Sequence, residues 1–180
     1  MRKLITILSV LIVMLSTSCK KPSDYYSKAV YSGNMAISLQ QMESRIERIQ
    51  EGYAPEPINL VSRISMRLAT NENYLSELKE FLGNSDTDQM INAAIKHLEY
   101  DLESVKNPKT IEFLNEIDKK LTPEDLQLVI EKYETHLDAL YEQKNELWKK
   151  YDKELTKYAK DNNIKENFYG PDLKPIENTK

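Results

Sequence analysis

Residues 122–160 read TPEDLQLVIEKYETHLDALYEQKNELWKKYDKELTKYAK, and this stretch decides the fold. A capping hydroxyl on Thr122, a proline in the first turn and two acids predict the start of a helix there. A helix over 123–160 is about 55 Å long, and its apolar stripe is unstable in water unless it packs against other helices. Only Lys144 and Glu154 interrupt that stripe. Its apolar members are Leu126, Ile130, Tyr133, Leu137, Leu140, Leu147, Tyr151 and Tyr158.

The preceding residues carry the same spacing of three and four, and no strand-like alternation of any length occurs. We expect helices over about 23–32, 35–53, 61–82, 91–105 and 108–121, with Gly33-Asn34 interrupting the first two. Ser85 to Asp88 has the Ser-x-x-Asp form of a helix start. The pattern predicts an all-α fold, an elongated antiparallel helical bundle with coiled-coil-like packing over 23–160. Residues 161–180 lose the pattern and are expected to form a flexible tail.

Length and composition exclude several classes of protein. The 180 residues suit one domain with tails, and four glycines leave little room for a sandwich, a barrel or a Gly-rich phosphate loop. The net charge of −4 argues against nucleic-acid binding, which needs a basic surface. A single cysteine excludes an internal disulfide and a cysteine-rich zinc module.

The first nineteen residues have the organisation of a secretory leader. Arg2 and Lys3 precede an apolar run over 4–15, and small residues lead to Cys19. The apolar run of about twelve residues is too short to span a bilayer, which needs about 20. We therefore predict that residues 1–18 are a signal peptide.

The position of Cys19 resembles the signal of bacterial lipoproteins, although Ser16 departs from the commonest pattern. The resemblance implies that Cys19 becomes the first residue of the mature chain and carries the acyl chains that hold it to the membrane. Residues 19–22 would then be a lipidated linker. Lys20 is not the acidic signal that this family uses for inner-membrane retention, so the resemblance favours the outer membrane. The alternative is an ordinary signal peptide with a chance cysteine.

No catalytic, metal or cofactor site is predicted. The residues three before His97 and His136 are not acids, so the Glu-x-x-His motif of di-metal bundles is absent. Each histidine is expected on the surface or half-buried. Asn71 and Lys144 are polar at stripe positions, which indicates either a buried polar contact that sets register or a stripe that reaches solvent there.

These features predict a lipid-anchored envelope protein that acts by contact, as an interaction or scaffold component. The alternative is a lipoprotein that sequesters a ligand or toxin. A protein partner or a second copy would bind through the helix 123–160, unless the first helix covers that stretch and makes it core. The possible partner surface consists of Leu147, Trp148, Tyr151, Leu155 and Tyr158.

Overall fold

The computed structural model describes residues 21–53 and 56–165, and the predicted all-α class is confirmed over them. No strand occurs in these two ranges. None of their helices is long and apolar enough to cross a membrane. The helices are α2 (Pro22–Met35), α3 (Ser38–Gln50), α4 (Leu60–Lys79), α5 (Asp88–Lys106), α6 (Pro108–Ile117) and α7 (Pro123–Asp161).

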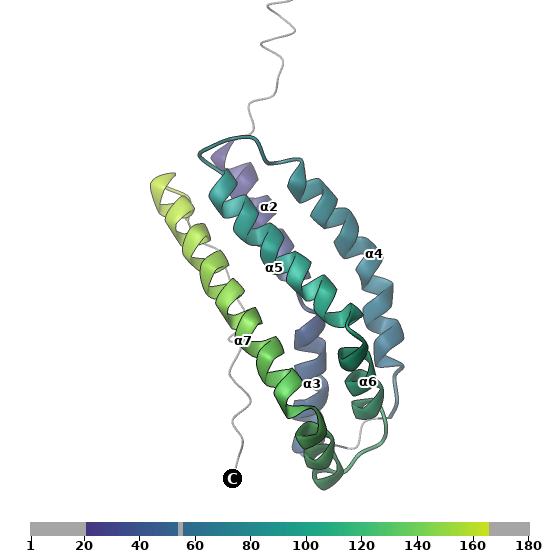
Figure 1. Ribbon diagram of the computed structural model, residues 1–180. Coiled ribbons are helices and arrows are strands. Elements are labelled where there is room, and N and C mark those ends of the chain that lie inside the picture. The colour runs from purple at the N-terminus through teal and green to yellow at the C-terminus, as the bar shows by residue number, and fades with distance from the viewer. Residues whose placement is uncertain (1–20, 54–55, 166–180) are drawn as a thin grey trace, which may run out of the picture.

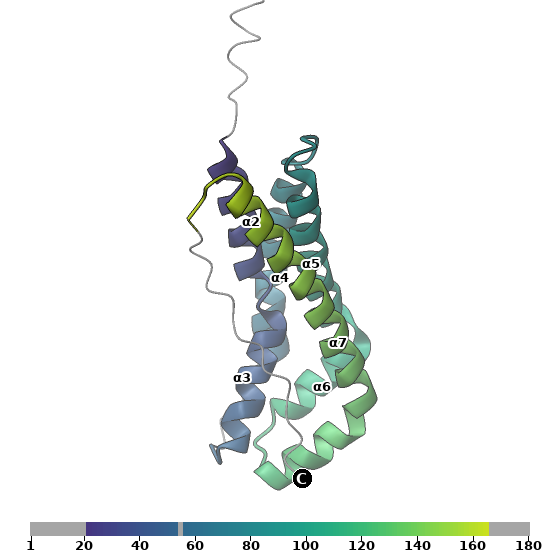
Figure 2. The same ribbon diagram turned by 90° about the vertical axis from the view of Figure 1, so that its left-hand side faces the viewer.

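The helices form four antiparallel columns, two of which are broken (Figures 1 and 2). α2 continues into α3, and α5 continues into α6, whereas α4 and α7 each span a column alone. The 39-residue α7 is longer than either α5 or α6, and both pack along it. Two shorter helices in succession therefore share the length of the long one.

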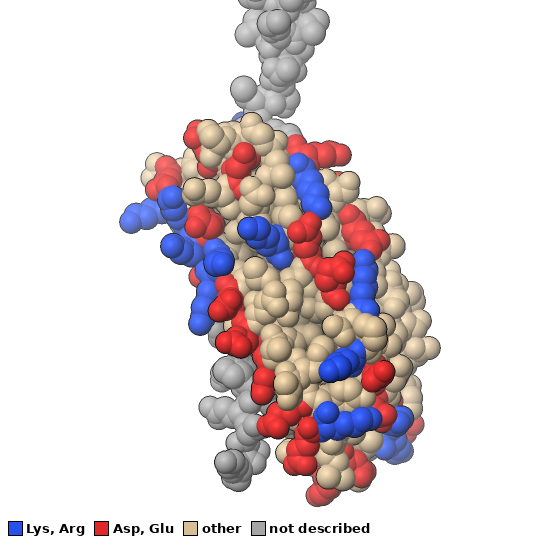
Figure 3. Space-filling view, in the orientation of Figure 1, with Lys and Arg blue, Asp and Glu red and all other residues tan. Residues whose placement is uncertain are grey.

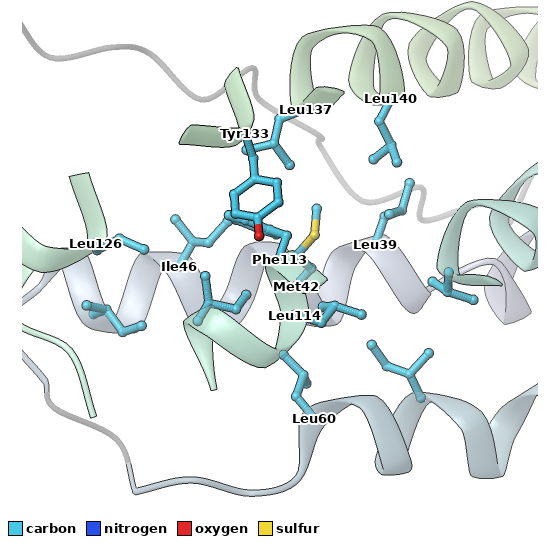
Figure 4. Packing of buried hydrophobic residues seen from close by; sticks show 14 residues of the cluster. Leu39, Met42, Ile46, Leu60, Phe113, Leu114, Leu126, Tyr133, Leu137 and Leu140 are labelled. Carbon is cyan, nitrogen blue, oxygen red and sulfur yellow. The ribbon is translucent and has the colours of Figure 1, made fainter. Parts of the chain in front are cut away.

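Two apolar clusters occupy opposite halves of the bundle. One is built from α3, α4, α6 and α7 around Phe113 and Tyr133 (Figure 4). The other is built from α2, α4, α5 and α7 around Ala29, Ile91 and Tyr151. The break between α2 and α3 falls where one cluster gives way to the other, and buried polar residues lie at that level.

Helix starts agree with the sequence prediction in one case and differ in another. Thr122 and Asp125 form a reciprocal capping box at the start of α7, as predicted. Ser85 does not cap α5, which begins at Asp88. The Asp88 carboxylate instead accepts hydrogen bonds from the backbone N–H groups of Gly83 and Asn84, at 2.9 and 3.2 Å, and so closes the preceding turn.

Several predicted boundaries were also wrong by a few residues. The break between α2 and α3 lies at Ala36 and Ile37, after Gly33-Asn34, because Gly33 fits inside α2 where the Tyr151 ring approaches it. α4 ends at Lys79 and α6 at Ile117, each ahead of the predicted end. α7 extends to Asp161, and residues 166–180 of the predicted tail lie outside the described residues.

Candidate functional site

Cys19, the predicted lipidation site, lies outside the described residues, as does the leader before it. Lipid attachment and the signal peptide therefore stay predictions. The first described helix, α2, starts at Pro22 directly after that segment.

The possible partner surface on α7 is largely core. Tyr151, Leu155 and Tyr158 are buried, while Leu147 and Trp148 are half-buried. α2 covers this stretch, since the Tyr151 hydroxyl donates to the carbonyl of Ala29 at 2.8 Å. Of the two outcomes that the sequence left open, burial beneath the first helix holds for the three buried side chains.

The close contact between α2 and α7 depends on a glycine. A Cβ atom at Gly33 would lie 2.2 Å from the Tyr151 hydroxyl oxygen and 2.6 Å from its ring. Real Cβ contacts are never that short, so any other residue at this position would push the two helices apart. Gly33 thus allows the first helix to cover the tyrosine.

His97 is buried rather than exposed, which corrects the sequence expectation. Only 1% of it is exposed, and its ring stacks on Tyr151 and meets Trp148 at centroid distances of 5.3 and 5.2 Å. Its Nδ1 has no hydrogen-bond partner among the described residues. Burial, with a smaller contribution from the Lys144 charge, lowers the pKa of His97 to about 4, so the ring is neutral near pH 7. Among the described residues no three His, Cys, Asp or Glu side chains gather as a metal site would require.

A layer of buried polar side chains crosses the middle of the bundle, and we call it the polar layer. Asn71 and Lys144 both belong to it, so their stripe positions do not reach solvent. The layer consists of Asn71, His97, Asp101 and Lys144, with the half-buried Glu43 beside them.

The polar layer satisfies the helix ends at the break between α2 and α3. Asn71 donates from its amide to the carbonyl of Met35 at 2.9 Å. The Asp101 carboxylate accepts from the backbone N–H groups of Ser38 and Leu39 at 3.2 and 3.4 Å. These are the groups that a helix start leaves without intrahelical partners. Across the core, α4 therefore caps the end of α2 and α5 caps the start of α3.

The charges of the polar layer compensate one another. The Lys144 ammonium lies 4.0 Å from the Asp101 carboxylate. Burial raises the pKa of Asp101 and lowers that of Lys144, and each charge opposes the shift of the other. Burial also raises the pKa of Glu43, again opposed by Lys144. This arrangement assigns the layer a structural role, because its polar atoms point at helix ends and at each other.

Another buried charge lies at the end of the bundle where α6 ends and α4 begins. Arg45 on α3 is 4% exposed and donates to the carbonyls of Ile117 and Asp118 at 3.1 and 3.2 Å. The Asp118 carboxylate in turn accepts from the backbone N–H groups of Ile58 and Leu60, both at 3.0 Å. Arg45 and Asp118 therefore tie the end of α6 to the start of α4.

An open groove lies next to this cluster, between α3 and α4. These helices approach each other little, although both pack on α6, and the space between them measures about 600 Å³. We call it the arginine groove, because all four arginines of the described residues line it. The lining residues are Ile37, Gln40, Gln41, Ser44, Arg45, Arg48, Ile58, Leu60, Arg63, Met66 and Arg67.

Three of these arginines form no ion pair within the described part of the chain, namely Arg48, Arg63 and Arg67. Elsewhere on the surface some lysines pair with acids, as Lys79 does with Glu99 at 2.7 Å, while others, such as Lys149 and Lys150, form no ion pair with a described residue. Figure 3 shows acidic and basic side chains interspersed over the face that carries α5 and α7. The arginine groove differs by gathering three such unpaired arginines around one hollow.

Apolar side chains are exposed beside those cations. Met66 is 75% exposed and Ile58 is 39% exposed, and both line the groove. A guanidinium group presents several donors in a plane that matches a carboxylate or phosphate. The groove therefore combines the chemistry needed to hold an anion with the chemistry needed to hold an apolar side chain. We take it as the candidate functional site.

Comparison of this chain with protein-family models, with curated proteins and with solved structures finds no match. The arginine groove was not predicted from the sequence. A signal was present, because every arginine after Arg2 falls within 45–67 while lysines are spread along the whole chain. The groove opens because α3 diverges from α4, and the spacing of apolar residues within a helix does not indicate how two helices diverge.

Proposed function

We propose that this protein is a lipid-anchored helical protein of the bacterial envelope that acts by contact, as an interaction or scaffold component of a membrane-associated assembly. The observation that carries the contact role is the arginine groove, where three arginines without an acidic partner among the described residues lie beside exposed apolar side chains. Such a surface favours binding by a molecule with the complementary character. The anchor rests on the position of Cys19 after an apolar leader.

Metabolic labelling tests the anchor. Cells expressing the chain are grown with a palmitate analogue, and the protein is purified and examined for label. We expect label on the wild type and none on Cys19→Ala, with the wild type recovered in the outer-membrane fraction. Unlabelled wild type, or label that survives the substitution, would contradict the anchor.

Site-specific crosslinking tests the contact role. A photoreactive residue replaces Met66 in the groove, and a matched control replaces Leu128, which is 67% exposed on α7. We expect a discrete crosslinked product from position 66 in intact cells and a weaker or different pattern from position 128. Identical patterns from both positions would contradict a role for the groove.

The alternative function, sequestration of a ligand or toxin, draws support from the size of the groove. About 600 Å³ lies within the range of small-molecule sites. In that case a compound extracted with the purified protein would raise its melting temperature, and the crosslinking at position 66 would give no product with another protein.

A further inference from the structure

The arginine groove lies far from the N-terminal end of the bundle, where a lipid would be attached. α2 and α3 run in succession away from that end, and the groove begins only at Ile37 (Figures 1 and 2). From Pro22 to Ser44 the helical rise amounts to about 33 Å. Charges at that distance are screened from an anchoring membrane, since the Debye length is about 8 Å at physiological ionic strength. A soluble or neighbouring molecule, rather than the anchoring leaflet, is within reach of the groove.

The arginines are attached at separate positions along the two helices that flank the groove. Arg63 and Arg67 are one turn apart on α4, about 6 Å along its axis. Arg48 lies on the facing helix α3, at the end of a lining stretch from Ile37 that is about 16 Å long. A single small anion engages donors that meet at one place, whereas a row of separated cations suits a row of separated anions.

The groove opens where two neighbouring helices of the bundle diverge. α2 and α4 pack together in one half of the bundle, through the contacts of Tyr31 with Tyr74 and of Lys28 with Glu77. In the other half α3 and α4 diverge, and no helix among the described residues fills the space between them. An amphipathic helix laid into such a space buries one face and keeps its flanks beside the helices on either side.

We propose that the arginine groove binds an acidic amphipathic helix of a partner protein. Apolar side chains of that helix pack on Ile58 and Met66, and carboxylates on its flanks pair with Arg48, Arg63 and Arg67. The inference rests on the proposed function, action by contact, and adds the chemistry of the partner. Although the chain as a whole carries a net charge of −4, the unpaired arginines of the groove attract an acidic partner locally.

Fluorescence anisotropy with two designed peptides tests the proposal on the full chain purified in mild detergent. Both peptides have about four helical turns with leucine at every third or fourth position, the spacing by which groove-bound helices contact their sites. One carries glutamate beside the leucines and the other carries glutamine, so they differ only in charge. We expect the glutamate peptide to bind at least about tenfold more tightly, and to weaken as salt is added.

The double variant Arg63→Gln with Arg67→Gln locates the binding. It is expected to weaken binding of the glutamate peptide by about tenfold or more, since the charge-assisted hydrogen bonds of two guanidinium groups to its carboxylates are lost. The matched control, Lys149→Gln with Lys150→Gln, removes two exposed charges from α7 and should leave binding unchanged. Met66→Glu, which places a like charge in the groove, should abolish binding of the glutamate peptide. Circular dichroism confirms that each variant folds.

Several results would overturn the proposal. Equal affinity for both peptides, or equal loss in the arginine and lysine variants, would exclude an acidic helix in the groove. Arginine-dependent binding of inorganic phosphate or of anionic-lipid vesicles without binding of the glutamate peptide would assign the groove to another ligand. Arginine-dependent self-association would assign it to a second copy. If the glutamate peptide bound only to a variant truncated after Lys165, residues 166–180 would be the occupant of the groove in the full chain. Failure of any kind here leaves the palmitate labelling of Cys19 unaffected, so the two proposals fail separately.

Discussion

The polar layer and the arginine groove both hold charged groups beside apolar side chains, but they differ in whether those groups have partners of opposite charge. In the polar layer the ammonium of Lys144 lies 4.0 Å from Asp101, whose carboxylate also caps α3. In the groove Arg48, Arg63 and Arg67 have no acidic partner among the described residues. Charge that is compensated inside the bundle fixes the fold, whereas charge left without a partner at the surface is available to another molecule.

The first prediction breaks the polar layer. Lys144→Ala removes the cation and leaves the Asp101 carboxylate buried with 1% exposure. Removing one member of a buried pair typically lowers the free energy of unfolding by about 3–5 kcal/mol, because the remaining charge stays unsolvated. Urea denaturation measures the loss, and Lys149→Ala on the exposed face of α7 serves as the control, with an expected change below about 0.5 kcal/mol.

A second substitution separates the ion pair from helix capping. Asp101→Asn combined with Lys144→Met removes both charges but keeps a side-chain carbonyl that can accept from Ser38 and Leu39. The double variant should recover most of the stability lost in Lys144→Ala. If it is as unstable as the single variant, the pair is not the reason for the loss.

The second prediction concerns pH and the histidine beside the layer. The unfolded chain protonates His97 near pH 6.5, about the ordinary value, whereas burial lowers the pKa of His97 in the folded chain to about 4. Between these values the unfolded state binds more protons, so the free energy of unfolding falls as the solution is acidified. The loss attributable to this residue is about 3 kcal/mol, at about 1.4 kcal/mol per pH unit.

Comparison with His97→Gln isolates that contribution. Burial raises the pKa values of Asp101 and Glu43, so protonation of these acids raises the free energy of unfolding on acidification. This effect opposes that of His97. Both acids are present in the wild type and in the variant, and their contribution cancels in the difference. Denaturation curves at pH 7 and pH 4.5 should show a larger loss for the wild type. Equal losses would mean that His97 is protonated in the folded chain.

The third prediction tests whether α2 covers Tyr151, which the sequence indicated as part of a possible partner surface. Gly33→Ala places a methyl group 2.2 Å from the Tyr151 hydroxyl, which forces α2 away from α7. Overpacking of this kind lowers stability by about 1–3 kcal/mol, against a gain of up to about 1 kcal/mol from the better helix propensity of alanine. Thermal denaturation provides the measurement.

The same substitution made in a Tyr151→Leu chain provides its control. Leucine lacks the hydroxyl and ring atoms that approach Gly33, so Gly33→Ala should be neutral or slightly stabilising there. A loss of the same size in both backgrounds would show that the strain has another origin and that the helix contact is looser than described.

These regions differ in how far the sequence could predict them. The apolar spacing and the capping box at Thr122 and Asp125 are local, and they fixed the helices and the start of α7. Lys144 stood out as a polar stripe residue, but its partner Asp101 lies on another helix, and pairing across helices depends on their register. Tyr151 belongs to the apolar stripe whether it contacts a partner or the core, and only the position of α2 shows that it is core. The arginine groove depends on two helices that diverge, which no spacing within one helix encodes.

The last and smallest effect is expected in the groove itself. Arg63→Gln with Arg67→Gln should change the free energy of unfolding by less than about 0.5 kcal/mol, because neither side chain forms an ion pair with a described residue. Arg45→Gln in the same groove should lower it by about 1–3 kcal/mol, since its guanidinium satisfies the buried ends of α6. If all three arginines proved equally important for stability, the groove would be a structural cluster like the polar layer. A stable double variant that loses the glutamate peptide, beside an unstable Arg45 variant, separates the arginine that holds the fold from those that face a partner.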